Sequence, residues 1–234
     1  MKKVFVLTIT VISLSLFMIS CKDKEENDTT PPTISFTDND ILILDLGDKT
    51  AAMKGVIAKD DVDGDITSSI TLLTDLAELE TIGYITLKYS VSDAAKNTVT
   101  AERPAVVSSR KLTGRYEVTM LPEGLEIPLT PFIITVSELE TVKLNITNFH
   151  GDFYKWAPIP VIPDPDRQSG KLIIDVEGNF NDSKEGVVYT EITGEVHYEK
   201  VNGEYLIVSL EYTLDPKDSG SKGSFSSTKC ELIP

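Results

Sequence analysis

Short segments in which apolar and polar residues alternate recur along most of this chain, and this period of two restricts its fold more than any other feature. The clearest run covers residues 84–92, where Ile85, Leu87, Tyr89 and Val91 alternate with polar residues. Successive side chains of a strand point to opposite faces, so such a run predicts a strand with one buried and one solvated face. No segment long enough for a surface helix shows a period near 3.6 residues. The sequence therefore predicts an all-β protein.

The alternation continues in the second half of the chain. Its apolar positions are Val142, Leu144 and Ile146, then Leu172, Ile174 and Val176, then Ile192, Val196 and Tyr198, then Leu206, Val208, Leu210 and Tyr212. A chain of this length suits one or two domains, and the pattern divides near residues 108–112. We expect one β domain over residues 33–107 and a second, all-β domain over residues 112–234. The second domain is either a β-sandwich or a lipocalin-like barrel.

The first twenty residues have the pattern of an export signal. Lys2 and Lys3 precede an apolar stretch over residues 4–19, which is too short for a typical membrane-spanning helix of about 20 residues. Residues 18–21, MISC, resemble a bacterial lipobox. In lipoproteins of that pattern the chain is cut before the cysteine and the thiol is acylated. The resemblance implies a signal peptide over residues 1–20, lipidation of Cys21 as the membrane anchor, and a flexible linker over residues 21–32.

The charged run over residues 22–26, KDKEE, follows the lipobox directly. It resembles the lysine-plus-acidic signal that directs Bacteroidota lipoproteins to the outer face of the outer membrane. A solvated spacer has the same composition, because such residues bury too little apolar area to fold. The resemblance implies a protein of the outer membrane that faces the cell exterior.

The overall charge excludes one class of partner. The chain has 22 basic and 37 acidic residues and a formal net charge of −15. Nucleic acid and anionic lipid are repelled by such a field, so we expect no nucleic-acid partner. With Cys21 acylated, Cys230 has no cysteine left to pair with. We interpret Cys230 as a small buried apolar residue.

Three motifs in the first half occur in the same order as in a known family. They are PPTI at residues 31–34, DDVDGDIT at residues 60–67, and Gly83-Tyr84 leading into VSDAAKNT at residues 91–98. Together they resemble the bacterial surface immunoglobulin-like domain that also occurs in some pesticidal crystal proteins, which implies an Ig-like β-sandwich. That family has glycine where this chain has Lys96. The turn is therefore either strained at Lys96 or of another type, with Asn97 left-handed.

The acidic run in the second motif has two interpretations. Asp60, Asp61, Asp63 and Asp65 could supply oxygen ligands to calcium, which takes about 6–8 of them. The spacing is not that of an EF-hand, because Ile66 would occupy the glycine position. Short acidic side chains also cap and turn the chain by accepting backbone N–H bonds. We favour this second interpretation, keep calcium as the alternative, and expect no other cofactor.

The second half carries a further resemblance. Residues 112–118, LTGRYEV, and residues 149–154, FHGDFY, are similar to the C-terminal domain of an uncharacterised group of Bacteroidota lipoproteins. That group sits beside glycan-uptake systems. Phe153, Tyr154 and Trp156 precede a proline-rich loop over residues 157–166. Flat rings match the apolar face of a sugar, so these three residues are candidate glycan ligands; the alternative is that they fill the core of the second domain.

One hairpin can be derived in detail. Asn202-Gly203 favours a two-residue type I′ turn, but that turn would place Leu206 opposite Glu199 and mix the two faces. We therefore predict a three-residue loop with a left-handed Gly203 and a bulge, which places Leu206 opposite Tyr198.

The search for catalytic chemistry is negative. The chain has no HExxH, GxSxG, paired CxxC or glycine-rich phosphate motif, and His150 and His197 are its two histidines. We expect a non-catalytic surface lipoprotein that binds glycan beside an outer-membrane uptake complex, with the Ig-like domain as a spacer. The alternatives are a structural or adhesive module that contacts another protein, and a lipocalin-like carrier of a small apolar ligand.

Overall fold

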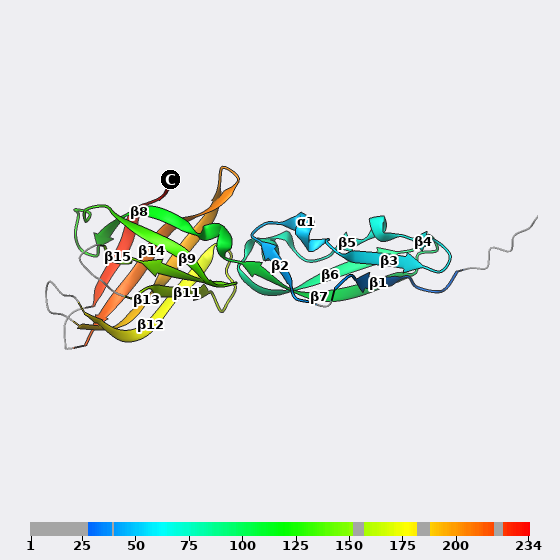
Figure 1. Ribbon diagram of the computed structural model, residues 1–234, viewed down its shortest axis with the longest axis horizontal. Coiled ribbons are helices and arrows are strands. Elements are labelled where there is room, and N and C mark those ends of the chain that lie inside the picture. The colour runs from blue at the N-terminus through cyan, green and yellow to red at the C-terminus, as the bar shows by residue number, and fades with distance from the viewer. Residues whose placement is uncertain (1–27, 39, 152–156, 182–187, 218–221) are drawn as a thin grey trace, which may run out of the picture.

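The computed structural model of the chain describes residues 28–38, 40–151, 157–181, 188–217 and 222–234. Within them two β units lie end to end along the long axis of the molecule, strands β1–β7 in the first and β8–β15 in the second (Figure 1). The helix α1 (Lys49–Ala52) is a single turn. No helix in these ranges has the length and apolar character needed to cross a bilayer. The prediction of an all-β protein is confirmed.

The first unit consists of two sheets, with strand orders β1-β3-β4 and β2-β7-β6-β5. Its strands are β1 (Thr33–Phe36), β2 (Leu42–Asp45), β3 (Val56–Asp60), β4 (Gly64–Asp65), β5 (Thr71–Leu72), β6 (Gly83–Ser92) and β7 (Thr98–Ser108). Phe36 of β1 and Tyr89 of β6 face each other with ring centroids 5.8 Å apart. The Tyr89 hydroxyl donates to the Ala52 carbonyl at 2.6 Å. The two sheets therefore enclose a shared core, as in a sandwich.

The turn between β6 and β7 contains the predicted departure at Lys96. Lys96 itself has a φ of 74°, in the left-handed region that favours glycine. Asn97 does not have a positive φ. Its backbone N–H donates to Asp93 Oδ1 at 2.8 Å and its side-chain amide donates to Asp93 Oδ2 at 2.8 Å. Of the two alternatives from the sequence, the structure has the strained turn at Lys96.

The second unit is a closed barrel of eight strands in which every neighbouring pair is antiparallel. Each strand pairs with the next along the chain, and the last strand pairs with the first. The strands are β8 (Gly114–Pro122), β9 (Phe132–Glu140), β10 (Lys143–Thr147), β11 (Ile159–Pro163), β12 (Lys171–Asn181), β13 (Val188–Val201), β14 (Glu204–Pro216) and β15 (Gly223–Ile233). Of the two folds predicted for this half, the structure has the barrel.

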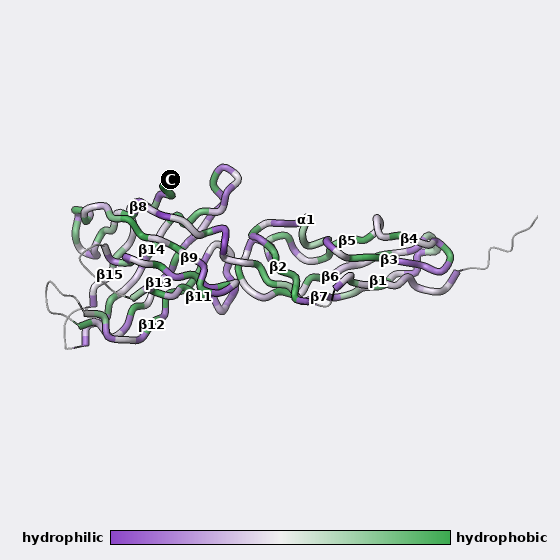
Figure 2. Tube along the Cα trace, viewed as in Figure 1, coloured by the Kyte–Doolittle hydropathy of each residue, from purple (hydrophilic) through white to green (hydrophobic). Residues whose placement is uncertain are grey.

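Apolar side chains fill the interior of the barrel. Val118, Ile134, Leu144, Val161 and Leu172, from five different strands, expose 0–1% of their surface. Their polar neighbours along each strand point outward, which is the alternation that the sequence showed and that Figure 2 follows along the chain. An internal cavity large enough for water would give the side chains that line it accessible surface. These side chains have almost none, so the core around them is packed.

The predicted hairpin loop was wrong. Asn202 and Gly203 have φ values of 52° and 93°, and Val201 pairs with Glu204, so the turn has two residues and Leu206 lies opposite Glu199. A bulge between His197 and Tyr198 shifts the register of β13 against β14 beyond the turn. This bulge restores the match of buried faces, so no third loop residue is needed.

The two units meet at a short joint of hydrogen bonds. The chain passes from one to the other through the 3₁₀ turn Arg110–Leu112. The buried Tyr198 hydroxyl of the barrel accepts a bond from the Ile82 backbone N–H at 3.2 Å and donates to the Glu80 carbonyl at 3.3 Å. Arg167 of the β11–β12 connection donates to the Tyr84 carbonyl at 2.8 Å. Arg167 also forms an ion pair with Glu78 at 3.0 Å. These contacts all reach residues 78–84 of the first unit and help to dock it on the barrel.

Candidate functional site

A groove of about 450 Å³ runs along the outer wall of the barrel, in the half that lies away from the first unit (Figure 1). Residues 121–125, 193–195, 211–213 and 224–226 line it. Strand register explains why they meet. Glu195 of β13 lies opposite Glu211 of β14, Glu211 lies opposite Ser226 of β15, and Ser226 lies opposite Leu121 of β8. One row of outward side chains thus crosses four strands.

The groove combines acceptors, hydroxyl groups and apolar surface. Glu195 and Glu211 supply carboxylates, while Thr193, Thr213, Ser224 and Ser226 supply hydroxyls. Thr213 and Ser224 share a hydrogen bond of 3.3 Å. The mixture is that of a site for a ligand rich in hydroxyl groups, because carboxylates accept and hydroxyls both donate and accept hydrogen bonds.

A charged network holds Glu195 at one edge of the groove. Its carboxylate lies 3.2 Å from Lys171 Nζ and 3.2 Å from His197 Nε2, and Lys171 also lies 3.2 Å from Asp164. The hydrogen bond between Lys171 and Asp164 is the main cause of the raised pKa of Lys171. Burial acts to raise the pKa of Asp164, but hydrogen bonds from the Asp166 backbone and from Lys171 outweigh it and keep this pKa below its usual value. Lys171 and Asp164 therefore both stay ionised at neutral pH.

Aromatic side chains form the inner end of the groove. Tyr212 and Phe225, which line it, stack at 5.3 Å between ring centroids. Phe149 lies 4.4 Å from Tyr212, and His150 lies 4.7 Å from Phe225. His150 Nδ1 and the Tyr212 hydroxyl share a hydrogen bond. His150 lies in the turn that follows β10 and is buried in this cluster.

The glycan ligands predicted from the sequence, Phe153, Tyr154 and Trp156, lie outside the described residues. The described chain reaches the groove just before them, since His150 contacts both Tyr212 and Phe225. Cys21, the predicted lipidation site, also lies outside the described residues.

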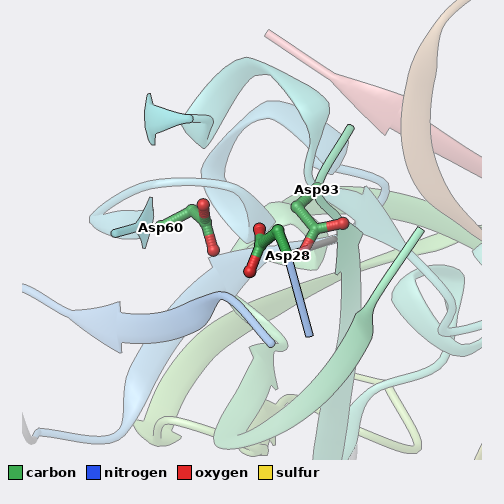
Figure 3. A group of neighbouring side chains, drawn as sticks. All are labelled: Asp28, Asp60 and Asp93. Carbon is green, nitrogen blue, oxygen red and sulfur yellow. The ribbon is translucent and has the colours of Figure 1, made fainter. Parts of the chain in front are cut away.

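A second cluster lies at the opposite end of the molecule. Carboxylate oxygens of Asp28, Asp60 and Asp93 lie within 4.8 Å of one another, and Figure 3 shows the three side chains turned toward a common centre. Asp28 precedes β1, Asp60 ends β3 and Asp93 follows β6. The structure thus joins three segments that are about thirty residues apart, a spacing that no local motif reveals.

The other acidic residues named from the sequence serve elsewhere. Asp63 Oδ2 accepts a hydrogen bond from the Ala94 backbone at 2.6 Å, and Asp65 Oδ1 accepts one from the Thr67 backbone at 3.0 Å. Asp61 is exposed. The capping interpretation describes the bond of Asp65, whereas the bond of Asp63 reaches the distant turn after β6. Asp60 is the member of the run that enters the cluster.

The sequence missed Asp28, Asp93, Glu195 and Glu211 as site residues. A signal for Asp93 was present, because the turn motif VSDAAKNT contains it. Glu195 and Glu211 gave no signal, since an outward glutamate on a strand is ordinary solvated surface and only strand register places the two side by side.

Comparisons with solved structures give several distant likenesses, among them the following two. A lipoprotein from Bacteroides thetaiotaomicron superposes with a TM-score of 0.32 at 16% identity, over 84% of this chain and 100% of that one. The CBM51-2 and INT domains of ZmpB from Clostridium perfringens, in a structure with GlcNAc, superpose with a TM-score of 0.27 at 14% identity, over 86% of this chain and 44% of that one. No family model and no curated protein matches the sequence. At these TM-scores neither likeness carries an argument about function.

Proposed function

We propose that this chain is a non-catalytic, lipid-anchored protein of the cell surface that binds a glycan in the groove on the outer wall of its barrel. The groove carries the proposal. Its three carboxylates and the hydroxyl groups of its serine and threonine residues lie within about 450 Å³ and beside the ring of Phe225. A sugar offers the complementary surface, with many hydroxyl groups around its rim and apolar C–H faces.

The charge of the groove narrows the ligand class. Glu123, Glu195 and Glu211 line it, and the whole chain is strongly acidic. Uronic acids and sulfated sugars would be repelled by this field. The groove therefore favours neutral glycans or glycans with amino groups.

The arrangement of the units supports a spacer role for the first unit. The described chain begins at the end of the first unit that is remote from the barrel, and the groove lies on the far half of the barrel (Figure 1). An anchor at Cys21 would hold the barrel away from the membrane by the length of the first unit. The joint at Tyr198 and Arg167 would keep that distance steady.

The carboxyl groups support a binding role rather than catalysis. A general acid needs a carboxyl group whose pKa is raised. In the described residues, each carboxyl group whose pKa departs clearly from its usual value has it lowered; these are Asp45, Asp60, Asp65 and Asp164.

The packed core of the barrel argues against the alternative of a lipocalin-like carrier. A closed barrel is the fold that a lipocalin-like carrier requires, and this chain has one. Its described inward side chains, such as Ile134 and Leu144, leave no accessible surface to a ligand. We therefore place the ligand on the outer wall.

Glycan-array binding by the soluble chain from residue 22 onward tests the proposal. We expect retention of neutral or amino-bearing glycans, and Glu211→Gln should weaken it by roughly tenfold or more, because a charged hydrogen bond contributes about 1.5–3 kcal/mol. Glu102→Gln, on the first unit, is the matched control and should bind as the parent does. Silence across the array, or an equal loss in both variants, would rule out the groove. Hydrolysis of a retained glycan would instead reveal an enzyme.

The anchor has its own test. Mass spectrometry of the native protein should find acyl chains on Cys21, and Cys21→Ser should release the protein from the membrane fraction. An unmodified thiol on a membrane-bound chain would contradict the anchor but leave the groove untouched.

A second candidate, contact with another protein, is favoured by the connection between β8 and β9. Leu125, Ile127 and Leu129 are exposed there, Ile127 to 79%, and Figure 2 shows hydrophobic stretches in this region. Exposed apolar clusters beside polar surface mark protein contacts. Cross-linking in whole cells that is lost in Ile127→Asp, together with a silent glycan array, would favour this candidate.

A further inference from the structure

We propose that Asp28, Asp60 and Asp93 bind a calcium ion, which fastens the segment before β1 to the outer end of the first unit. This site is independent of the groove and of the proposed glycan. It lies on the other unit and uses none of the same residues.

The spacing of the three carboxylates fits a shared ion. Calcium binds oxygen at about 2.3–2.6 Å, so two of its ligands are separated by at most about twice that distance. The three oxygens lie within 4.8 Å of one another, which meets this limit (Figure 3). Three carboxylates can offer up to six oxygens, and water can supply the rest.

Asp60 gives an independent indication of a missing partner. The residue is only 9% exposed, and its Oδ2 is buried without a hydrogen-bond partner. A buried carboxylate oxygen is unfavourable unless a donor or a cation compensates it. Figure 3 shows this carboxylate turned toward Asp28 and Asp93, so a cation between the three would satisfy it.

Backbone N–H groups hold the other oxygen of the Asp60 carboxylate in place. Asp60 Oδ1 accepts hydrogen bonds from the Asp63 N–H at 2.8 Å and the Val62 N–H at 2.9 Å. Among the described residues, no lysine or arginine forms an ion pair with Asp28, Asp60 or Asp93. The negative charge of the cluster is therefore unbalanced by the protein.

Asn97 already joins two of the three segments. Its side-chain amide donates to the Asp28 carbonyl at 3.0 Å and to Asp93 Oδ2 at 2.8 Å. Asp28 and Asp93 are thus held near each other before any ion arrives, which lowers the entropy lost on binding. Oxygen ligands alone favour calcium over zinc, which prefers nitrogen and sulfur, and calcium accepts more flexible ligand geometries than the strictly octahedral magnesium.

Binding would affect the tether. Asp28 lies a few residues before Thr33, where β1 begins, and a few residues after Cys21, the predicted anchor. An ion shared with Asp60 and Asp93 would clamp this segment against the globule. Calcium would then control the angle at which the first unit leaves the membrane.

Titration calorimetry of calcium into the chelator-treated chain from residue 22 onward, which retains every described residue, tests the site. We expect a single calcium ion per chain, a much weaker response to magnesium, and a thermal midpoint that rises with calcium concentration. Calcium should also slow amide hydrogen exchange at residues 28–30. No heat and no thermal shift at millimolar calcium would overturn the proposal.

Variants then locate the ion. Asp28→Asn should lower the calcium affinity by about tenfold or more, since it removes one of three charged ligands from a segment outside the sheets. Asp60→Asn should do the same. Asp61→Asn removes an equal charge from the exposed part of the same acidic run and should retain the affinity. If Asp61→Asn loses as much affinity as Asp28→Asn, the binding is diffuse and the site is wrong.

Discussion

The two β units of this chain deal with their sheet edges in different ways. The first leaves open edges on two small sheets and holds its turns and short helical segments with acidic side chains. Asp48, Asp65 and Asp75 each accept a backbone N–H within three residues. The barrel has long strands and pairs its last strand with its first, so it has no free edge. The first unit therefore relies on local bonds at its turns, whereas the barrel relies on register between distant strands.

Truncation of one core leucine in each unit should produce the largest effect. Leu87→Ala in the first unit and Leu144→Ala in the barrel each remove a side chain that is fully buried, and each should cost about 2–5 kcal/mol of unfolding free energy. We expect each variant to lower the transition of its own unit most in chemical denaturation. Leu73→Ala and Leu139→Ala, both exposed, are the controls. Equal shifts of one common transition would mean that the units unfold together.

Gly194→Ala should weaken only the barrel. A Cβ at this position would lie 2.1 Å from the Glu211 carbonyl oxygen and 2.6 Å from Tyr212 Cα, both backbone atoms of β14. The strands must separate, at a cost of about 1–3 kcal/mol. Gly178→Ala is the control, because its Cβ would meet only the ring of Phe180, 3.2 Å away. A barrel transition unchanged by Gly194→Ala would show that β13 and β14 can part freely.

Tyr198→Phe probes the coupling between the units. It removes the hydroxyl that bridges Ile82 and Glu80 and leaves a buried backbone N–H without a partner, at a cost of about 1 kcal/mol. We expect the transitions of the two units to separate further in calorimetry. Tyr84→Phe, whose ring is exposed, should leave them unchanged. Identical behaviour of both variants would place the coupling elsewhere.

The thiol of Cys230 should report the barrel without disturbing it. Burial raises the pKa of this thiol to about 12, so little thiolate forms near neutral pH and labelling by a disulfide reagent should be slow until β15 opens. In the chain from residue 22 it is the single thiol. Because the folded pKa is raised above the unfolded value near 8.5, the stability that this partly buried thiol contributes is complete below that pH and falls as the pH rises beyond it. Fast labelling of the folded chain would contradict the raised pKa.

Local patterns were sufficient for the strands. Residues 84–92 were predicted as a strand from alternation alone and lie in β6 (Gly83–Ser92). The acidic side chains of the β3–β4 turn were predicted as caps, and Asp60 and Asp65 accept the expected backbone bonds. Both features depend on residues that are near one another in the chain.

Register was harder to predict, and the error at Asn202-Gly203 shows why. The turn follows its local preference for the two-residue form, and the mismatch of faces is corrected by a bulge at His197 and Tyr198. A sequence displays the preference of the turn but not the position at which a strand absorbs an extra residue. The placement of Glu195 beside Glu211 depends on that register.

The sequence by itself determined that this protein is built of strands and that its turns are rich in acid, because both follow from side chains within a few residues of one another. Only the tertiary structure decided that β15 closes on β8, that Asp28 and Asp93 meet Asp60, and that a groove forms over β13, β14 and β15. These meetings join residues that are far apart in the chain, and they are set by how the strands pair and how the core packs.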